Sequence, residues 1–134
     1  MFKTISLSLF IALFILSCKH KSRPTTAMDT GTTFIRATLD GDFDEAKTLL
    51  YNDTLNDQFF QSYMMMYERL PDADKKNYKD ADYVINKYTD QNDSVSVINF
   101  SNTYMKKPLE IKLVRKNGDW LVDFKYTVSD SSQF

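Results

Sequence analysis

The chain has 134 residues with 17 basic and 18 acidic side chains, and its formal net charge of −1 makes nucleic acid a poor partner. One cysteine excludes an internal disulfide, and one cysteine with one histidine cannot build the familiar zinc sites, so we expect no metal and no cofactor. A glycine-rich phosphate loop is excluded, because the 3 glycines of the chain, Gly31, Gly41 and Gly118, are far apart in the sequence.

The first 17 residues have the pattern of a secretory leader. Lys3 supplies the positive start, and the apolar stretch from Ile5 to Leu16 has the length of a signal-peptide core. A membrane-spanning helix needs about 20 apolar residues. Lys19 opens a basic segment that stops the apolar run from extending, so we do not expect a spanning anchor.

The leader ends at Cys18. The segment Ile15-Leu16-Ser17-Cys18 resembles the bacterial lipobox, although that family prefers Leu where this chain has Ile15. The resemblance implies that the Cys18 thiol takes a diacylglyceryl group and that the mature chain begins there. It predicts a lipoprotein of the bacterial cell envelope, held by lipid and facing the periplasm, with inner or outer membrane left open. The alternative is an ordinary signal peptide cleaved nearby, with a free or buried cysteine.

Residues 18–32 are predicted to form the lipidated cysteine and a flexible tether, because they are rich in Lys, Ser and Thr and include Pro24. A flexible coil of about 14 residues reaches roughly 20 Å. His20 lies in this tether, so no pocket would surround it as a general base. Residues 33–128 are expected to form one α+β domain, followed by a tail at 129–134.

Apolar spacing predicts helices from residue 33 to about 77. Gly41 should end the first helix, since glycine adopts the left-handed C-cap conformation, and Asp42 should cap the second. A third helix is expected after Asp53-Thr54, and Pro71 ends it or opens a short fourth turn. The expected buried stripes are Phe34, Ile35, Thr38 and Leu39; Phe43, Ala46, Leu49 and Leu50; and Leu55, Phe59, Phe60, Tyr63, Met66, Tyr67 and Leu70.

From about residue 80 the apolar period changes to 2, which predicts four strands at 82–89, 94–104, 109–116 and 119–128. Asn117-Gly118 is the turn of a tight hairpin, and it fixes a register. The predicted pairs are Lys116–Asp119, Leu113–Val122, Lys112–Asp123, Ile111–Phe124, Glu110–Lys125 and Leu109–Tyr126. The second strand has apolar residues on both faces, so it is either covered on both sides or bulged.

Two segments resemble the small nuclear transport factor 2-like domains. Phe34 to Ala46 is similar to their opening, in which a helix ends at Gly-Asp and a short second helix follows. Ile111 to Asp123 is similar to their closing hairpin, with Gly-x-Trp before the last strand. The resemblance implies a cone, with helices packed on a curved four-stranded antiparallel sheet. Some members are ketosteroid isomerases or epoxide hydrolases, while others bind ligands or partners, so the fold alone does not give the function.

The interior of such a cone is our candidate site. We expect a pocket lined by Phe60, Tyr63, Met64, Tyr67, Phe100 and Phe124. Three methionines in a row, Met64 to Met66, cannot all face one core, so at least one should be exposed or line a cavity, where methionine adapts to apolar groups. The predicted function is therefore non-enzymatic binding of a small apolar ligand or a protein partner, with no catalytic residue assigned.

Two other functions stay open. An isomerase or hydrolase would need a buried Asp beside a Tyr hydroxyl inside the cone. Tyr63, Tyr67, Tyr83 and Tyr88 are the candidate donors, with Asp82 or Asp123 as the base, although the predicted register pairs Asp123 with Lys112 on the outer face. The third alternative is an assembly module that forms a homodimer through its sheet, which the charged pairs of the last hairpin oppose.

Overall fold

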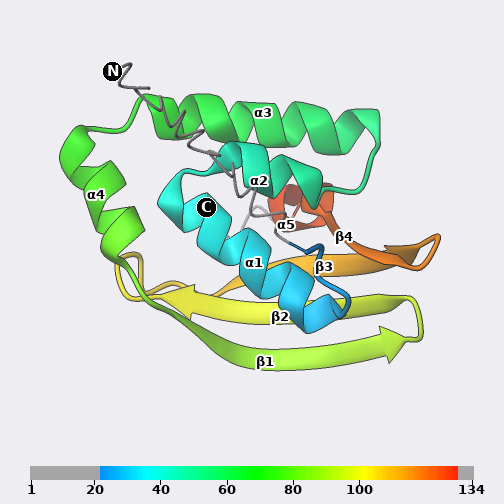
Figure 1. Cartoon of the computed structure of the whole chain (residues 1–134). Coiled ribbons are helices and arrows are strands. Elements are labelled where there is room, and N and C mark those ends of the chain that lie inside the picture. The colour runs from blue at the N-terminus through cyan, green and yellow to red at the C-terminus, as the bar shows by residue number, and fades with distance from the viewer. Residues whose placement is uncertain (1–21, 130–134) are drawn as a thin grey trace, which may run out of the picture.

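The computed structural model describes residues 22–129 (Figure 1). Its elements follow the order α1 (Ala27–Asp40), α2 (Phe43–Thr48), α3 (Thr54–Glu68), α4 (Asp72–Asp80), β1 (Tyr83–Asn92), β2 (Val95–Asn102), β3 (Leu109–Lys116), β4 (Asp119–Asp123) and α5 (Phe124–Ser129). The strands form one antiparallel sheet in the order β1-β2-β3-β4. The predicted α+β class, with helices before a four-stranded antiparallel sheet, is confirmed.

The leader, Cys18 and His20 lie outside the described residues. Between residues 22 and 129, none of the helices combines the length and apolar character needed to cross a membrane.

The first helix begins at Ala27, so the prediction that residues up to 32 form a flexible tether is wrong for residues 27–32. Thr26 caps the helix by accepting the Asp29 N–H at 3.0 Å. The early turns pack on the sheet, and a Cβ placed on Gly31 would lie 2.3 Å from the Ile98 side chain. A glycine within the helix therefore permits close packing, although it weakens the helical pattern in the sequence.

The predicted helix boundaries at Gly41 and Asp53 are confirmed. Gly41 adopts a positive φ of 73°, and its N–H bonds back to the end of α1. Asp42 accepts the Glu45 N–H at 3.1 Å and so caps α2. Asp53 caps α3 in the same way, by accepting the Asn56 N–H at 2.9 Å. Pro71 precedes a fourth helix of 9 residues, which is longer than the predicted turn.

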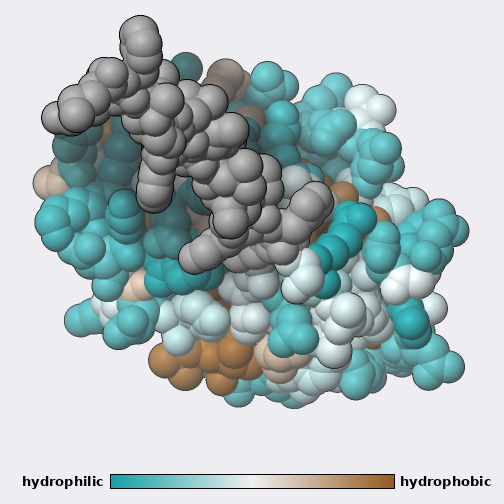
Figure 2. Space-filling view, viewed as in Figure 1, coloured by the Kyte–Doolittle hydropathy of each residue, from teal (hydrophilic) through white to brown (hydrophobic). Residues whose placement is uncertain are grey.

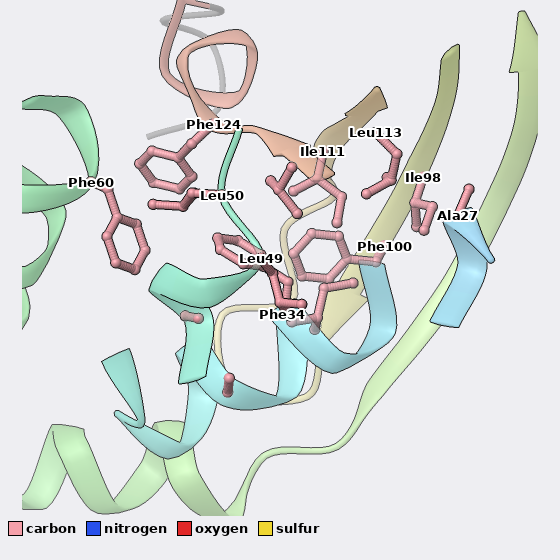
Figure 3. Close-up of a cluster of buried hydrophobic side chains, with 14 of the residues drawn as sticks. Ala27, Phe34, Leu49, Leu50, Phe60, Ile98, Phe100, Ile111, Leu113 and Phe124 are labelled. Atoms are coloured by element: carbon pink, nitrogen blue, oxygen red, sulfur yellow. The ribbon is translucent and has the colours of Figure 1, made fainter. Parts of the chain in front are cut away.

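The core lies between the helices and the inner face of the sheet. Phe34, Leu49 and Phe100 converge there, as Figure 3 shows. The predicted burial of the third helix is wrong for three residues, since the exposed fractions of Leu55, Phe59 and Met66 are 52%, 38% and 50%. The helix α3 lies in an outer layer over α2 and α5 (Figure 1), so only one of its faces reaches the core.

The predicted hairpin register is confirmed from the turn as far as Lys112 and Asp123. Beyond Asp123 the prediction is wrong, because the chain leaves the sheet and forms α5. The pairs Ile111–Phe124, Glu110–Lys125 and Leu109–Tyr126 therefore do not form as strand partners. The cause is distant in sequence: the buried Asn56 of α3 accepts the Lys125 N–H at 2.7 Å and caps the new helix.

The second strand is central, and adjacent residues on its opposite faces, Val97 and Ile98, are both buried. This is the first of the two predicted alternatives. Register shifts occur instead in the edge strand β1, around residues 86 and 91.

Figure 2 shows a hydrophobic patch at the lower edge of the molecule, over β1, where Val84 is 58% exposed. Bulges in an edge strand discourage pairing with another sheet.

Candidate functional site

A small cavity of about 80 Å³ lies where one end of the sheet meets α1, α3 and α4. We call it the end cavity, and its lining residues are Thr38, Leu39, Tyr63, Met66, Tyr78, Phe100, Asn102, Met105 and Leu109. It is more enclosed than the broad hollows on the rest of the described surface. Its lining is mainly apolar and aromatic, which is the usual character of a binding site.

The rim of the end cavity is apolar and held in shape. Met66 is 50% exposed and Met105 is 38% exposed, so both side chains lie at its mouth. The Asn102 Oδ1 accepts the N–H groups of Tyr104 and Met105 at 3.1 and 2.8 Å, which fixes the loop after β2. The Tyr78 hydroxyl lies 3.1 Å from the Met105 sulfur. The mouth is therefore preorganised, with two adaptable methionine side chains.

Two hydrogen-bond donors of the cavity lining, the Tyr63 hydroxyl and the Asn102 Nδ2, make no bond to a protein group among residues 22–129, and neither is one of the described atoms that are cut off from solvent without a partner. Asn102 is only 4% exposed. The Tyr63 ring packs against Phe43, Phe60 and Phe124, with centroids 5.7 to 6.1 Å apart. Burial raises the pKa of the Tyr63 phenol, so the hydroxyl stays protonated and can donate. The cavity can thus receive an apolar group that carries a hydrogen-bond acceptor.

The residues predicted to line a pocket are divided between three places. Tyr63 and Phe100 line the end cavity. Phe60, Tyr67 and Phe124 are buried in the core. Met64 packs against the edge of the core and borders a shallow hollow between α3 and Phe43 of α2. The methionine prediction is confirmed, since Met65 and Met66 are both exposed and Met66 reaches the cavity.

Sequence reasoning missed the remaining lining residues, because they come from the ends of α1, α4 and β2, from the loop before β3 and from the first residue of β3. The hydrophobic period does not show which element ends meet in space. The segment from Asn102 to Met105 carried one usable signal, since an Asn near a strand end commonly bonds to the backbone two residues later.

None of the residues that line the end cavity carries a carboxylate. Asp123 is instead held by two lysines, with oxygen–nitrogen distances of 3.8 Å to Lys112 and 2.7 Å to Lys125. Asp82 is exposed in the loop before β1. The Asp and Tyr pocket required by an isomerase or hydrolase is therefore not assembled in this cavity.

Two Asp–Tyr pairs form among the described residues. The Tyr104 hydroxyl donates to the Asp74 carboxylate at 2.8 Å on the surface beside the end cavity, where Tyr104 packs on Tyr78, and the second pair lies at the opposite end of the described fold. Tyr88 and Ser96 donate hydrogen bonds to the Asp90 carboxylate at 2.5 and 2.6 Å. These bonds, that from Ser96 first, lower the pKa of Asp90, which makes its carboxylate a weaker base. Asp90 is also exposed, beside an open hollow that Trp120 borders. The geometry stabilises a carboxylate and does not provide a buried general base.

Among the described residues, no three His, Cys, Asp or Glu side chains are grouped so that they could hold a metal ion. Comparison of the chain with protein-family models, curated proteins and solved structures gave no match.

Proposed function

We propose that the protein is a lipoprotein of the bacterial cell envelope, acylated at Cys18, whose domain is a nuclear transport factor 2-like cone that binds a protein partner. The lipobox-like segment before Cys18 supports the anchor. The order of helices before a four-stranded antiparallel sheet, with Gly-Asp and Gly-x-Trp segments near its two ends, supports the cone. The observation that carries the binding function is the end cavity with its two unpartnered donors.

The size of the cavity favours a protein partner over a whole small molecule. Sites for small ligands usually enclose about 300–1,000 Å³, whereas the end cavity has about 80 Å³. It accommodates one apolar side chain, and binding energy at protein interfaces is often concentrated in such filled pockets. The backbone carbonyls of the inserted segment would accept hydrogen bonds from Tyr63 and Asn102, while Met66 and Met105 adapt to its flanks.

Neighbouring methionines on α3 give a matched test by cross-linking in cells. A photoreactive benzophenone amino acid at Met66 lies at the mouth of the end cavity, whereas the same group at Met65 borders the shallow hollow between α3 and α2. Both parent side chains are about equally exposed, at 50% and 52%. We expect a discrete adduct from position 66 that position 65 does not give. An adduct of twice the mass of the chain would identify the partner as a second copy.

Two substitutions of Thr38 show whether the cavity itself is used. Thr38→Met extends a longer side chain into the cavity and should abolish the adduct from position 66. Thr38→Val has nearly the shape of threonine, leaves the cavity open and should preserve the adduct. Equal adducts from positions 65 and 66, or an adduct that persists in Thr38→Met, would contradict the proposed site.

A further inference from the structure

The chain is attached to the domain before its first helix begins. One nitrogen of the Arg23 guanidinium lies 3.1 Å from the Asp119 carboxylate in the β3–β4 hairpin. The other donates to the Thr48 carbonyl at the end of α2, also at 3.1 Å. Arg23 therefore joins the incoming chain to two separate elements of the fold.

This attachment limits how far an anchor at Cys18 can lie from the domain. Five residue steps separate Cys18 from Arg23, and a fully extended chain spans at most about 3.6 Å per residue, or about 18 Å in all. The tether predicted from composition, at residues 18–32, would leave the domain free to turn. The contacts of Arg23 remove most of that length.

Arg23 lies four residues before the start of α1, whereas the end cavity lies at the other end of that helix, which Figure 1 shows as one straight element. The helix starts at Ala27, just after Arg23, and Thr38 in its last turn lines the cavity. The eleven residue steps from Ala27 to Thr38 span about 16 Å of helix. Thr25 and Thr26 border one hollow together with Asp93 and Arg115, so the turns after β1 and β3 also lie at the Arg23 end. We call this end the anchor end.

We propose that the acylated protein rests with its anchor end on the lipid headgroups and that the end cavity faces away from the bilayer. This orientation depends on the acylation of Cys18 proposed above. With Cys18 within about 18 Å of Arg23, the anchor end can rest on the membrane while the intervening chain stays slack. Bringing the cavity end, about 16 Å further along α1, against the membrane would need the chain to be almost fully extended, which costs conformational entropy. The turns at the anchor end carry exposed polar residues of both charge signs, including Asp93, Lys116 and Asn117, which suits contact with a headgroup layer and not with hydrocarbon. The partner of the cavity then approaches from the aqueous side.

The cysteine content of the chain makes the test direct. Acylation blocks Cys18, so a cysteine introduced elsewhere is the single free thiol. Asp93→Cys places a fluorophore at the anchor end, and Lys79→Cys places it on α4 beside the end cavity; both parent residues are exposed. The full acylated protein is inserted into vesicles of phosphatidylethanolamine and phosphatidylglycerol that carry a quencher on some headgroups. With the labels separated by about the length of α1, quenching at position 93 should exceed that at position 79 by about twofold or more.

The variant Arg23→Ala tests the cause of the orientation. Without this contact the chain is free back to the cap of α1, and nine residue steps from Cys18 to Ala27 allow about 32 Å. The difference in quenching between the two labels should then shrink, and high salt should shrink it in the wild type, because both partners of the ion pair are 51% exposed.

Equal quenching of the two labels in the wild type, or stronger quenching at position 79, would overturn the orientation. A full difference that survives in Arg23→Ala would overturn the role of Arg23. Flotation of the protein with the vesicles is measured in the same samples. Loss of flotation would overturn the acylation, and the orientation with it, and so identifies a failure of the proposed function.

Discussion

Asn56 is the side chain whose removal should damage this fold most clearly. It is fully buried in the first turn of α3. Its Nδ2 donates to the Tyr51 carbonyl at 3.0 Å, and its Oδ1 accepts the Lys125 N–H at 2.7 Å. The second bond provides the cap that α5 lacks within its own sequence, so Asn56 holds the end of the chain against α3.

The expected loss in Asn56→Ala follows from these two bonds. Truncation leaves the Lys125 N–H without its partner, while the Tyr51 carbonyl keeps the Asp53 N–H at 3.0 Å. A donor that stays buried without a partner costs about 1–3 kcal/mol. Lys125 is partly exposed, so water can reach some of this surface. We therefore expect the free energy of unfolding to fall by about 1–3 kcal/mol.

Urea unfolding followed by circular dichroism measures this loss. Gln58→Ala is the matched control, because it removes an exposed amide from the same helix and should change stability by less than about 0.5 kcal/mol. Amide hydrogen exchange should also show weaker protection in α5 of Asn56→Ala than in the control. If Asn56→Ala lost no more stability than Gln58→Ala, Asn56 would not hold α5 in place.

Three further comparisons, with five substitutions between them, test other parts of the structure. Gly41→Ala and Gly118→Ala both place a Cβ at a positive φ, which costs about 1–2 kcal/mol. At Gly41 the new Cβ would also lie 2.8 Å from the Tyr67 hydroxyl, whereas at Gly118 it would meet none of the described residues within 4 Å. Thermal unfolding should therefore show the larger loss of stability for Gly41→Ala, and equal losses would contradict that contact. Tyr63→Phe should change the free energy of unfolding by less than about 0.5 kcal/mol or raise it, because the Tyr63 hydroxyl bonds to no protein group in the described part of the chain. Tyr88→Phe should lower it by about 1 kcal/mol, because the Tyr88 hydroxyl bonds to Asp90 and Ser96. The reverse order in urea unfolding would refute both hydrogen-bonding assignments. In the folded protein the hydrogen bond from Lys125 lowers the pKa of Asp53 below its usual 3.8. The Asp53–Lys125 pair therefore stabilises the fold fully above the unfolded pKa, and this contribution is lost as the pH falls through the lower folded pKa. Acid titration of Asp53→Asn should therefore show a shallower loss of stability below about pH 4 than the wild type, and identical curves would show that this pair does not contribute.

Features fixed by neighbouring residues were predictable from the sequence. Gly41-Asp42 ends one helix and caps the next, and Asn117-Gly118 sets the hairpin register as far as Asp123. Each depends on backbone preferences within a few residues, so no knowledge of distant contacts is required.

Features that depend on distant contacts were not predictable. Alternation of apolar residues continues through Phe124 and Tyr126, which favours a longer strand, yet a cap from Asn56, 69 positions from Lys125, starts a helix there. The stripe on α3 is broader than the face that reaches the core, since Leu55 and Phe59 stay exposed. The end cavity combines residues from several element ends, and no local pattern brings those ends together.

The intact mass of the protein isolated from bacterial membranes tests the anchor, on which the proposed function and the orientation both depend. We predict a chain that begins at Cys18 and carries a diacylglyceryl group, together with loss of membrane association and of lipid labelling in Cys18→Ser. A chain that begins at another residue, an unmodified Cys18 thiol, or membrane association unchanged in Cys18→Ser would contradict the account.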